Sequence, residues 1–289
     1  MQNVQRTVDF LVSIKAQIYL KALAKRMEVF MKYLEEQCPI LSKIEIAPGI
    51  YDVTLKAPGI AALASSGQFV NVLCETFTLR RPISICGFDK EKGTLRLVFE
   101  VRGEGTKWMS QSTEGEKFSV VGPLGRGFDV KDPSQKAVFV GGGIGVPPLL
   151  EAAKAYGENA TVIVGFRTAS ASILVDDFKK NGNHVQLATD DGSAGHHGFV
   201  TQLLQKHLDE NPCDVIYACG PTPMLKAVAD EAEKRGVFCK VSMEQRMACG
   251  VGACMVCVCK TLTPKGDDRY AQVCKNGPVF NAKEVVWNG

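Results

Sequence analysis

The chain has 289 residues, 45% of them hydrophobic and 22% charged, with a formal net charge of +3. This length fits two domains and an appendage, at roughly 100–200 residues per domain, and the composition excludes a disordered chain. Nucleic-acid binding is disfavoured because no dense Lys/Arg stripe with interleaved aromatic residues is present.

The cysteine content stands out, with eleven residues and therefore an odd number. Met1 to Tyr19 lacks the apolar core and cleavage site of a signal peptide, and no apolar stretch approaches the ~18 residues that cross a bilayer. We therefore expect a cytoplasmic protein without a membrane span, whose thiols are buried, catalytic or metal ligands.

The N-terminal 36 residues place apolar side chains at helical spacing and contain no Gly or Pro. They predict a helical extension over residues 1–38 that ends at Cys38-Pro39. Either it docks a partner protein or it packs on its own chain.

Residues 39–135 change to short β-rich segments separated by Gly, Pro and Ser. This pattern predicts a small antiparallel β-barrel. Its clearest strands are Ile50–Lys56, Gln68–Cys74, Thr94–Val101 and Lys117–Val121.

Two motifs in the barrel segment suit a long anionic ligand. In Arg81-Pro82-Ile83-Ser84, a guanidinium suits a phosphate and a hydroxyl three residues later suits a ring nitrogen. Gly103-Glu104-Gly105-Thr106 then opens a predicted helix, whose N-terminus attracts anions. Taken singly, such features are more often a surface arginine, a strand serine and a capped helix, so only their order along the chain is informative.

Residues 136–242 alternate apolar strands with helices, which predicts a parallel α/β layer. The strands are Ala137–Val140, Thr161–Gly165, Val185–Ala188 and Val215–Ala218, and the helices are Pro148–Tyr156, Phe199–Leu208 and Pro223–Arg235.

Two turns in this layer suit a dinucleotide. Gly143-Ile144-Gly145-Val146-Pro147-Pro148 joins a strand to a helix, although Pro148 stands where G-x-G-x-x-G has its last glycine. The second turn, Cys219-Gly220-Pro221, follows another strand of the same sheet. Many turns between a strand and a helix contain glycine for steric reasons alone. Two such turns in one sheet therefore indicate nucleotide binding more strongly than either turn does by itself.

Residues 243–289 carry the most specific motif. Four residues separate Cys249 from Cys254, two separate Cys254 from Cys257, and Cys274 follows, which is the plant-type [2Fe–2S] spacing. A structural zinc site or inert buried thiols are the alternatives. We interpret Cys259 as a core residue, with substitution as a ligand left open.

The order of these motifs resembles the ferredoxin–NADP reductase superfamily. From about residue 42 to the end, the chain resembles the electron-transfer subunits of class 1B dihydroorotate dehydrogenase, the PyrK family. The matching phrases are Arg81-Pro-Ile-Ser84, Gly143-Ile-Gly145-Val-Pro-Pro148, Ala218-Cys-Gly-Pro221, Met247-Ala-Cys-Gly-Val-Gly-Ala-Cys254 and Cys274-Lys-Asn-Gly-Pro-Val-Phe280.

The resemblance implies a binding site for each of three redox groups. Ser84 and Cys219 are then the residues beside the reacting rings, where they position and tune rather than transfer protons. The implied FAD residues are Arg81, Pro82, Ile83, Ser84, Val98, Phe99, Glu100, Gly105 and Thr106. The implied NAD(H) residues are Gly143, Gly145, Pro148, Cys219, Gly220 and Pro221, and the implied cluster ligands are Cys249, Cys254, Cys257 and Cys274.

The resemblance further implies a hetero-oligomer, a heterotetramer, in which the partner is an FMN-containing dihydroorotate dehydrogenase subunit. The implied pathway is pyrimidine biosynthesis. NAD is preferred over NADP on the same ground, while Arg167 is a cation that suits a 2′-phosphate. One alternative is the small subunit of a ferredoxin:NADP oxidoreductase or sulfide dehydrogenase, which typically has an acidic residue in place of one cluster cysteine. Others are a reductase serving another flavoenzyme and a zinc-bearing, non-catalytic interaction module.

Overall fold

The computed structural model describes residues 33–74, 77–130 and 132–287. Most of the predicted N-terminal helix lies outside these residues, but its predicted end is wrong. Leu34–Ala47 forms strand β1, in which Cys38 and Ile40 are buried while Leu41 is exposed. This two-residue alternation, together with pairing to a neighbouring strand from Leu34 to Pro39, outweighs the helical spacing of the apolar residues.

The first layer is a closed barrel in the order β1-β2-β5-β4-β3-β6, as the sequence predicts. Its interior is filled by apolar side chains such as Phe99 and Phe118, each at most 2% exposed. Two helices accompany it, α2 (Pro58–Leu63) and α3 (Glu104–Gln111). The remaining strands are β2 (Ile50–Lys56), β3 (Phe69–Leu73), β4 (Arg81–Asp89), β5 (Thr94–Glu100) and β6 (Lys117–Leu124).

The second layer is a seven-stranded sheet in the order β10-β9-β8-β7-β11-β12-β15. All of its pairs are parallel except β12 with β15, which confirms the predicted α/β layer. The strands are β7 (Ala137–Gly142), β8 (Ala160–Phe166), β9 (His184–Thr189), β10 (His196–His197), β11 (Val215–Cys219), β12 (Phe238–Ser242) and β15 (Val279–Asn281).

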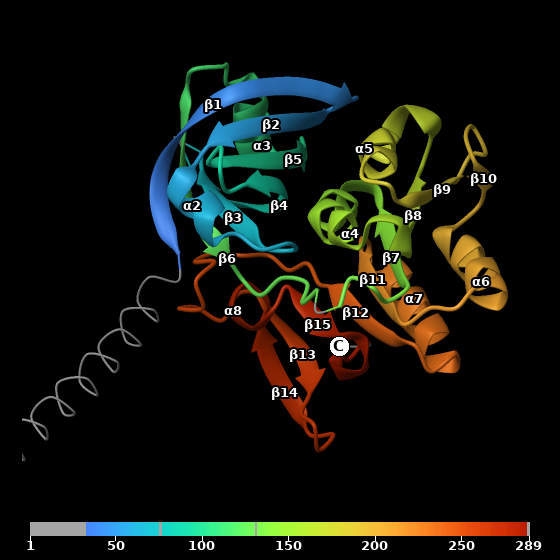
Figure 1. The fold of residues 1–289 in the computed structure, drawn as a ribbon. Coiled ribbons are helices and arrows are strands. Elements are labelled where there is room, and N and C mark those ends of the chain that lie inside the picture. Colours follow the sequence, from blue (N-terminus) through green and yellow to red (C-terminus); the bar gives the residue numbers. More distant parts are fainter. Residues whose placement is uncertain (1–32, 75–76, 131, 288–289) are drawn as a thin grey trace, which may run out of the picture.

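Helices and 3₁₀ turns connect these strands and cover both faces of the sheet (Figure 1). Along β7, Phe139 packs with one apolar cluster and Val138 and Val140 pack with the other, because successive side chains point to opposite faces. The connecting elements are η1 (Gly143–Gly145), η2 (Pro147–Leu149), α4 (Leu150–Tyr156), η3 (Gly157–Asn159), η4 (Ala169–Ala171), α5 (Val175–Lys180), α6 (Val200–Glu210) and α7 (Thr222–Lys234).

The C-terminal segment lies beneath both layers in Figure 1. It contains a two-stranded hairpin, and its last strand, β15, extends the α/β sheet. The predicted boundary at residue 243 is therefore crossed by sheet hydrogen bonds. Its elements are β13 (Val258–Leu262), β14 (Asp268–Gln272), α8 (Val273–Asn276), β15 and η5 (Ala282–Glu284).

Among the helices that the structure describes, none has both the length and the apolar character of a membrane span.

Candidate functional site

Two of the motifs predicted to bind FAD meet at the start of α3. Arg81 lies so close to Gly105 that a Cβ on Gly105 would overlap its guanidinium Nε. Its guanidinium carbon lies 4.9 Å from the centre of the Phe77 ring. The Thr106 hydroxyl accepts a hydrogen bond from the backbone N–H of Arg102 at 2.9 Å. A fixed cation thus stands beside a helix N-terminus, an arrangement that suits a diphosphate.

The neighbouring arginine has a different environment. Arg80 donates to the Ser119 carbonyl at 3.0 Å and forms an ion pair with Glu35 at 2.5 Å. It therefore joins barrel strands β1 and β6 instead of facing α3. The contacts of Arg80 thus support the barrel, whereas Arg81 lies at the start of α3.

Strand β4 presents its motif on the outside of the barrel. Ile83 and Ile85 are buried in the interior, whereas Pro82 is exposed and Ser84 half-buried. Val98 and Phe99 also divide between two environments: Phe99 fills the barrel, and Val98 packs into the apolar cluster shared with the α/β sheet. The outer face around β4 and β5 therefore turns toward the second layer.

A cleft of about 880 Å³ separates the two layers. On the barrel side it is lined by Glu100 and Arg102, and on the sheet side by the two predicted turns. These turns touch: a Cβ on Gly145 would lie 2.6 Å from the Gly220 nitrogen. The carboxyl edge of the parallel sheet thus forms a glycine-walled groove that suits a dinucleotide. The predicted residues that line the cleft are Glu100, Gly143, Gly145, Gly220 and Pro221.

Two predicted nucleotide residues lie behind the cleft wall. Pro148 is buried in η2. Cys219 is 3% exposed, and burial, with a smaller effect from Glu244, raises the pKa of its thiol to about 12. Cys219 is therefore a neutral thiol at physiological pH, which agrees with a positioning role rather than proton transfer.

Several cleft residues escaped the sequence prediction. Arg102 directly precedes the Gly103 motif, so its position next to that motif was an available signal. Glu244 and Asp190 carry no local motif, and only the fold brings them to the cleft. Arg167 also lines it, which places the cation considered for a 2′-phosphate at the nucleotide groove.

The four predicted cluster cysteines form two pairs. The Sγ atoms of Cys249 and Cys254 lie 3.3 Å apart, and the backbone N–H of Cys274 donates to Cys257 Sγ at 3.5 Å. A [2Fe–2S] cluster has two irons and takes four thiolates in all. Two pairs of cysteines, one pair for each iron, therefore fit a [2Fe–2S] cluster.

Backbone N–H groups surround the first thiol of the loop. Partial burial opposes ionisation of Cys249, but hydrogen bonds from the N–H groups of Val251, Cys254 and Ala253 lower its pKa to about 6. Such donors stabilise sulfur that carries negative charge. Cys249 is thus in an environment that favours a thiolate, whereas burial raises the pKa of the Cys274 thiol to about 12.

Gln272 holds this loop in place. Its side-chain amide donates to the carbonyl oxygen of Gly252 at 3.1 Å and also to that of Cys254. Lys275 lies on the other side, where a Cβ on Gly252 would be 2.5 Å from its Cδ. Lys275 follows Cys274 directly and stands in a motif phrase, whereas Gln272 belongs to no motif and is brought to the loop by the fold.

The zinc alternative requires several ligands around one ion. The contacts of the four cysteines run instead in two pairs, Cys249 with Cys254 and Cys257 with Cys274, and two pairs of thiolates match a cluster of two irons. Cys259 is 8% exposed and packs in the apolar cluster under the sheet.

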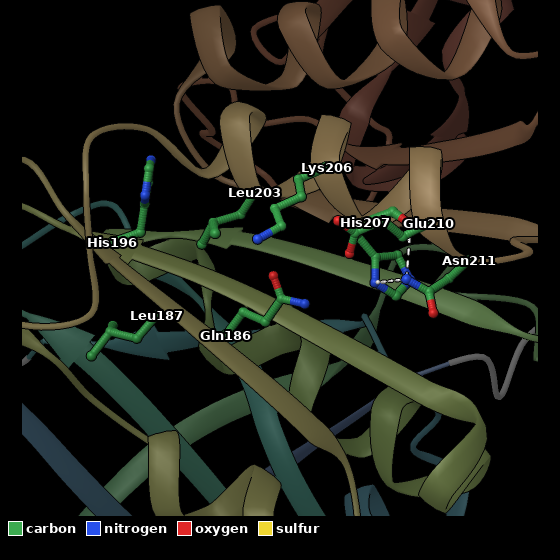
Figure 2. Close-up of a pocket in the computed structure, with 8 residues that line it drawn as sticks. All are labelled: Gln186, Leu187, His196, Leu203, Lys206, His207, Glu210 and Asn211. Carbon is green, nitrogen blue, oxygen red and sulfur yellow. Dashed lines mark hydrogen bonds between the residues drawn. The ribbon is translucent and has the colours of Figure 1, made fainter.

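Figure 2 shows a separate pocket of about 360 Å³ at the far edge of the sheet. Gln186 and Leu187 of β9 form one wall, and Lys206 and His207 of α6 form the other. It shares no lining residue with the cleft between the layers and contains none of the predicted site residues.

The fold and the site define a two-layer reductase of the ferredoxin-reductase type with a cysteine-rich cluster segment. The solved structure of an NADH-dependent reduced ferredoxin-NADP oxidoreductase, studied for flavin-based electron bifurcation, is 32% identical. It has a TM-score of 0.78 over 88% of this chain and 91% of that chain. A ferredoxin reductase of carbazole 1,9a-dioxygenase, 21% identical, shares the fold with a TM-score of 0.62 over 71% of this chain and 67% of its own.

Sequence relatives narrow this class. Residues 244–286 match the iron-sulfur cluster binding domain of dihydroorotate dehydrogenase B. The dihydroorotate dehydrogenase B (NAD(+)) electron transfer subunit of Fusobacterium nucleatum subsp. nucleatum is 41% identical over 260 residues, covering 86% of this chain and 98% of its own. That of Listeria monocytogenes serotype 4a is 42% identical over 261 residues, covering 87% and 99%. The chain belongs to the family of dihydroorotate dehydrogenase B electron transfer subunits.

Proposed function

We propose that this chain transfers electrons between NAD(H), FAD and a [2Fe–2S] cluster, as the electron-transfer subunit of a dihydroorotate dehydrogenase in pyrimidine biosynthesis. The observation that carries the proposal is the shared edge of the two layers, where the groove of Gly145 and Gly220 faces Glu100 of the barrel. Family membership points to the same function.

When bound, FAD supplies the exchange between a hydride and single electrons, and the [2Fe–2S] cluster supplies one-electron transfer. The role of the protein is then to position the reactants. Arg81 and the start of α3 bind the FAD diphosphate, and Ser84 orients the flavin on the outer face of β4. The remaining proposed FAD residues are Pro82, Ile83, Val98, Phe99, Glu100, Gly105 and Thr106.

The nucleotide residues form the opposite wall. Gly143, Gly145, Gly220 and Pro221 let the dinucleotide approach the backbone closely, and Pro148 and Cys219 support that wall from behind. Cys249, Cys254, Cys257 and Cys274 are the proposed cluster ligands. The division into residues 39–135, 136–242 and 243–289 is part of the same proposal, with β15 returning to the middle part.

The proposed partner is an FMN-containing catalytic subunit, joined in a heterotetramer, and the proposed location is the cytoplasm. The name shared by the relatives, an electron transfer subunit of dihydroorotate dehydrogenase B, supports such a partner.

A second candidate function is supported by the solved reductase structure, which is 32% identical over most of the chain. In that case the chain serves a ferredoxin:NADP oxidoreductase. The curated relatives reach 42% identity. The ferredoxin:NADP oxidoreductase subunits typically carry an acidic residue in place of one cluster cysteine, whereas this chain has Cys249. Both observations favour the dihydroorotate dehydrogenase assignment.

The test is anaerobic purification followed by titration with NADH. We expect flavin and iron-sulfur absorbance, iron and acid-labile sulfide in equal amounts, and bleaching of both chromophores by NADH. A colourless protein with one bound zinc contradicts the proposal. Faster reduction by NADPH than by NADH contradicts the coenzyme assignment alone and implicates Arg167.

The partner requires a separate experiment, which is anaerobic co-purification from the native host and identification of the co-eluting chain. We expect a dihydroorotate dehydrogenase catalytic subunit. A different flavoenzyme overturns the pathway and leaves the cofactor assignments in place.

A further inference from the structure

Asn71 is a buried amide on the outer face of the barrel. Its neighbours along β3, Val70 and Val72, are fully buried in the barrel interior. Because side chains alternate along a strand, Asn71 points outward, yet it is only 1% exposed. A polar side chain on the outside of the barrel is therefore covered by another part of the chain.

The covering part is the cysteine loop. Gly250, which directly follows the proposed ligand Cys249, lies so close to Asn71 that a Cβ on Gly250 would overlap the amide Nδ2. Gly250 has φ +69°, a conformation that disfavours any other residue at this contact. The amide of Asn71 thus faces the backbone of the loop that carries the proposed cluster ligands.

Asn71 is also adjacent to the proposed flavin strand. It pairs with Pro82 of β4, while Phe69 pairs with Ser84 two positions away. Its own carbonyl is within hydrogen-bond reach of Arg80 Nη1, at 3.4 Å. One residue therefore contacts the loop of the proposed cluster and is paired with the strand proposed to orient the flavin.

The amide itself is not fully satisfied. Asn71 Oδ1 is buried and has no hydrogen-bond partner in the described part of the chain. Leaving such an oxygen unpaired costs stability, and an apolar side chain of similar size would avoid that cost. Packing alone therefore does not explain an amide at this position.

We propose that Asn71 is a positioning residue for electron transfer between the flavin face of the barrel and the cluster loop. This inference rests on the proposed function. The side chain fixes the loop against β3, and its N–H groups, directed at the loop, favour the more negative, reduced form of the cluster. Hydrogen bonding and dipoles around the sulfur atoms are established determinants of the potentials of such clusters.

The test is potentiometry of Asn71→Leu, which keeps the side-chain size and removes the amide. We expect the cluster to become harder to reduce, with a shift of about tenfold in the flavin–cluster electron equilibrium, or about 59 mV for a one-electron carrier. The electron paramagnetic resonance spectrum of the reduced cluster should change. The flavin spectrum and the KM for NADH should stay unchanged.

Asn183→Leu is the matched control. Asn183 is 6% exposed and also has an unpaired Oδ1, but its Nδ2 donates to Ala153 and Gly157 in the α/β layer. The control should lose stability without changing the potential. A cluster potential and resonance spectrum equal to wild type in fully loaded Asn71→Leu overturn the inference.

Asn71→Ser covers the case in which the Leu variant does not incorporate the cluster, and we expect its cluster to be harder to reduce than that of wild type. Loss of the cluster from both Asn71 variants, with FAD retained and the Asn183→Leu cluster intact, supports the positioning role. Wild-type protein without iron or flavin refutes the proposed function itself, whereas a loaded wild type with unshifted Asn71 variants refutes only this inference.

Discussion

The barrel and the cysteine segment hold their sites in opposite ways. The barrel is sealed by its own apolar side chains, Ile83 and Phe99 among them, and the proposed flavin residues Arg81, Ser84 and Glu100 lie on the outside of a structure that is already complete. The cysteine segment has a short hairpin and a four-residue helix, and its buried cysteines share the apolar cluster of the neighbouring sheet. The barrel can thus be expected to fold without its cofactor, whereas metal ligation contributes to the fold of the cysteine segment.

The largest predicted effect tests this contrast directly. Cys249→Ser removes one thiolate from the first sulfur pair, and we expect complete loss of the [2Fe–2S] cluster because serine is a poor ligand for soft metal sites. Iron and sulfide analysis measures the loss. Flavin content should persist, because the barrel does not depend on the cluster loop.

Cys259→Ser is the matched control for this prediction. Cys259 pairs with Ala271 within the hairpin, and burial raises the pKa of its thiol, as is usual for a core cysteine. Its replacement should lower stability by about 1 kcal/mol and keep the cluster. Loss of iron from Cys259→Ser with retention in Cys249→Ser contradicts the ligand assignment.

The second effect concerns the barrel. Arg81→Ala should weaken FAD binding by about tenfold to hundredfold, because a charge-assisted hydrogen bond contributes about 1.5–3 kcal/mol. Flavin retention on gel filtration and fluorescence titration with FAD measure it. Arg80→Ala should instead lower thermal stability through loss of the Glu35 pair. Equal FAD affinities in the two variants would count against the assignment of Arg81.

A smaller effect tests the contact between the two layers. Arg96 of β5 forms ion pairs with Asp52 of the barrel and Asp177 of α5, both at 2.6 Å. Asp177→Asn removes only the pair between layers, and we expect the KM for NADH to rise about twofold to fivefold, as for a partly exposed pair. Asp176→Asn, which changes an exposed carboxylate next to it, should leave steady-state kinetics unchanged. A KM increase that is equal in both variants contradicts the role of the contact.

The smallest effect is a pH dependence at the pocket of Figure 2. Burial lowers the pKa of His207 below its ordinary value of 6.5. The unfolded chain is therefore protonated first, and stability should fall as the pH decreases from about 6.5 through the lowered pKa. His207→Gln should remove this contribution to the pH dependence of the free energy of unfolding. The contribution is less than about 1 kcal/mol, because solvent screens a partly exposed group. Urea denaturation at several pH values measures it, and identical slopes in both proteins contradict the prediction.

Much of the architecture was predictable because it rests on local patterns. Ile50–Lys56 is a strand with the predicted bounds, since its alternation is read directly from adjacent residues. The spacing from Cys249 to Cys257 is equally local. The strand at Leu34 was not predictable, because its pairing partner lies more than eighty residues away near Gly122.

The site was predictable only where a motif carries it. The glycine turns at Gly145 and Gly220 signal a backbone approach, and the structure brings them together. Glu244, Gln272 and Asn71 have no motif, because their roles depend on contacts between distant segments. Tertiary contact creates such positions, and single-sequence patterns do not contain that information.

Strand β15 has a mechanical consequence. After the chain supplies Cys274, it rejoins the sheet through Val279–Asn281 paired with β12, so the cysteine segment is anchored at both of its ends. It cannot swing like a tethered carrier arm. A partner protein must therefore come to a stationary point of exchange, and the shape of the encounter surface, not the reach of a flexible tail, selects which protein exchanges electrons with the chain.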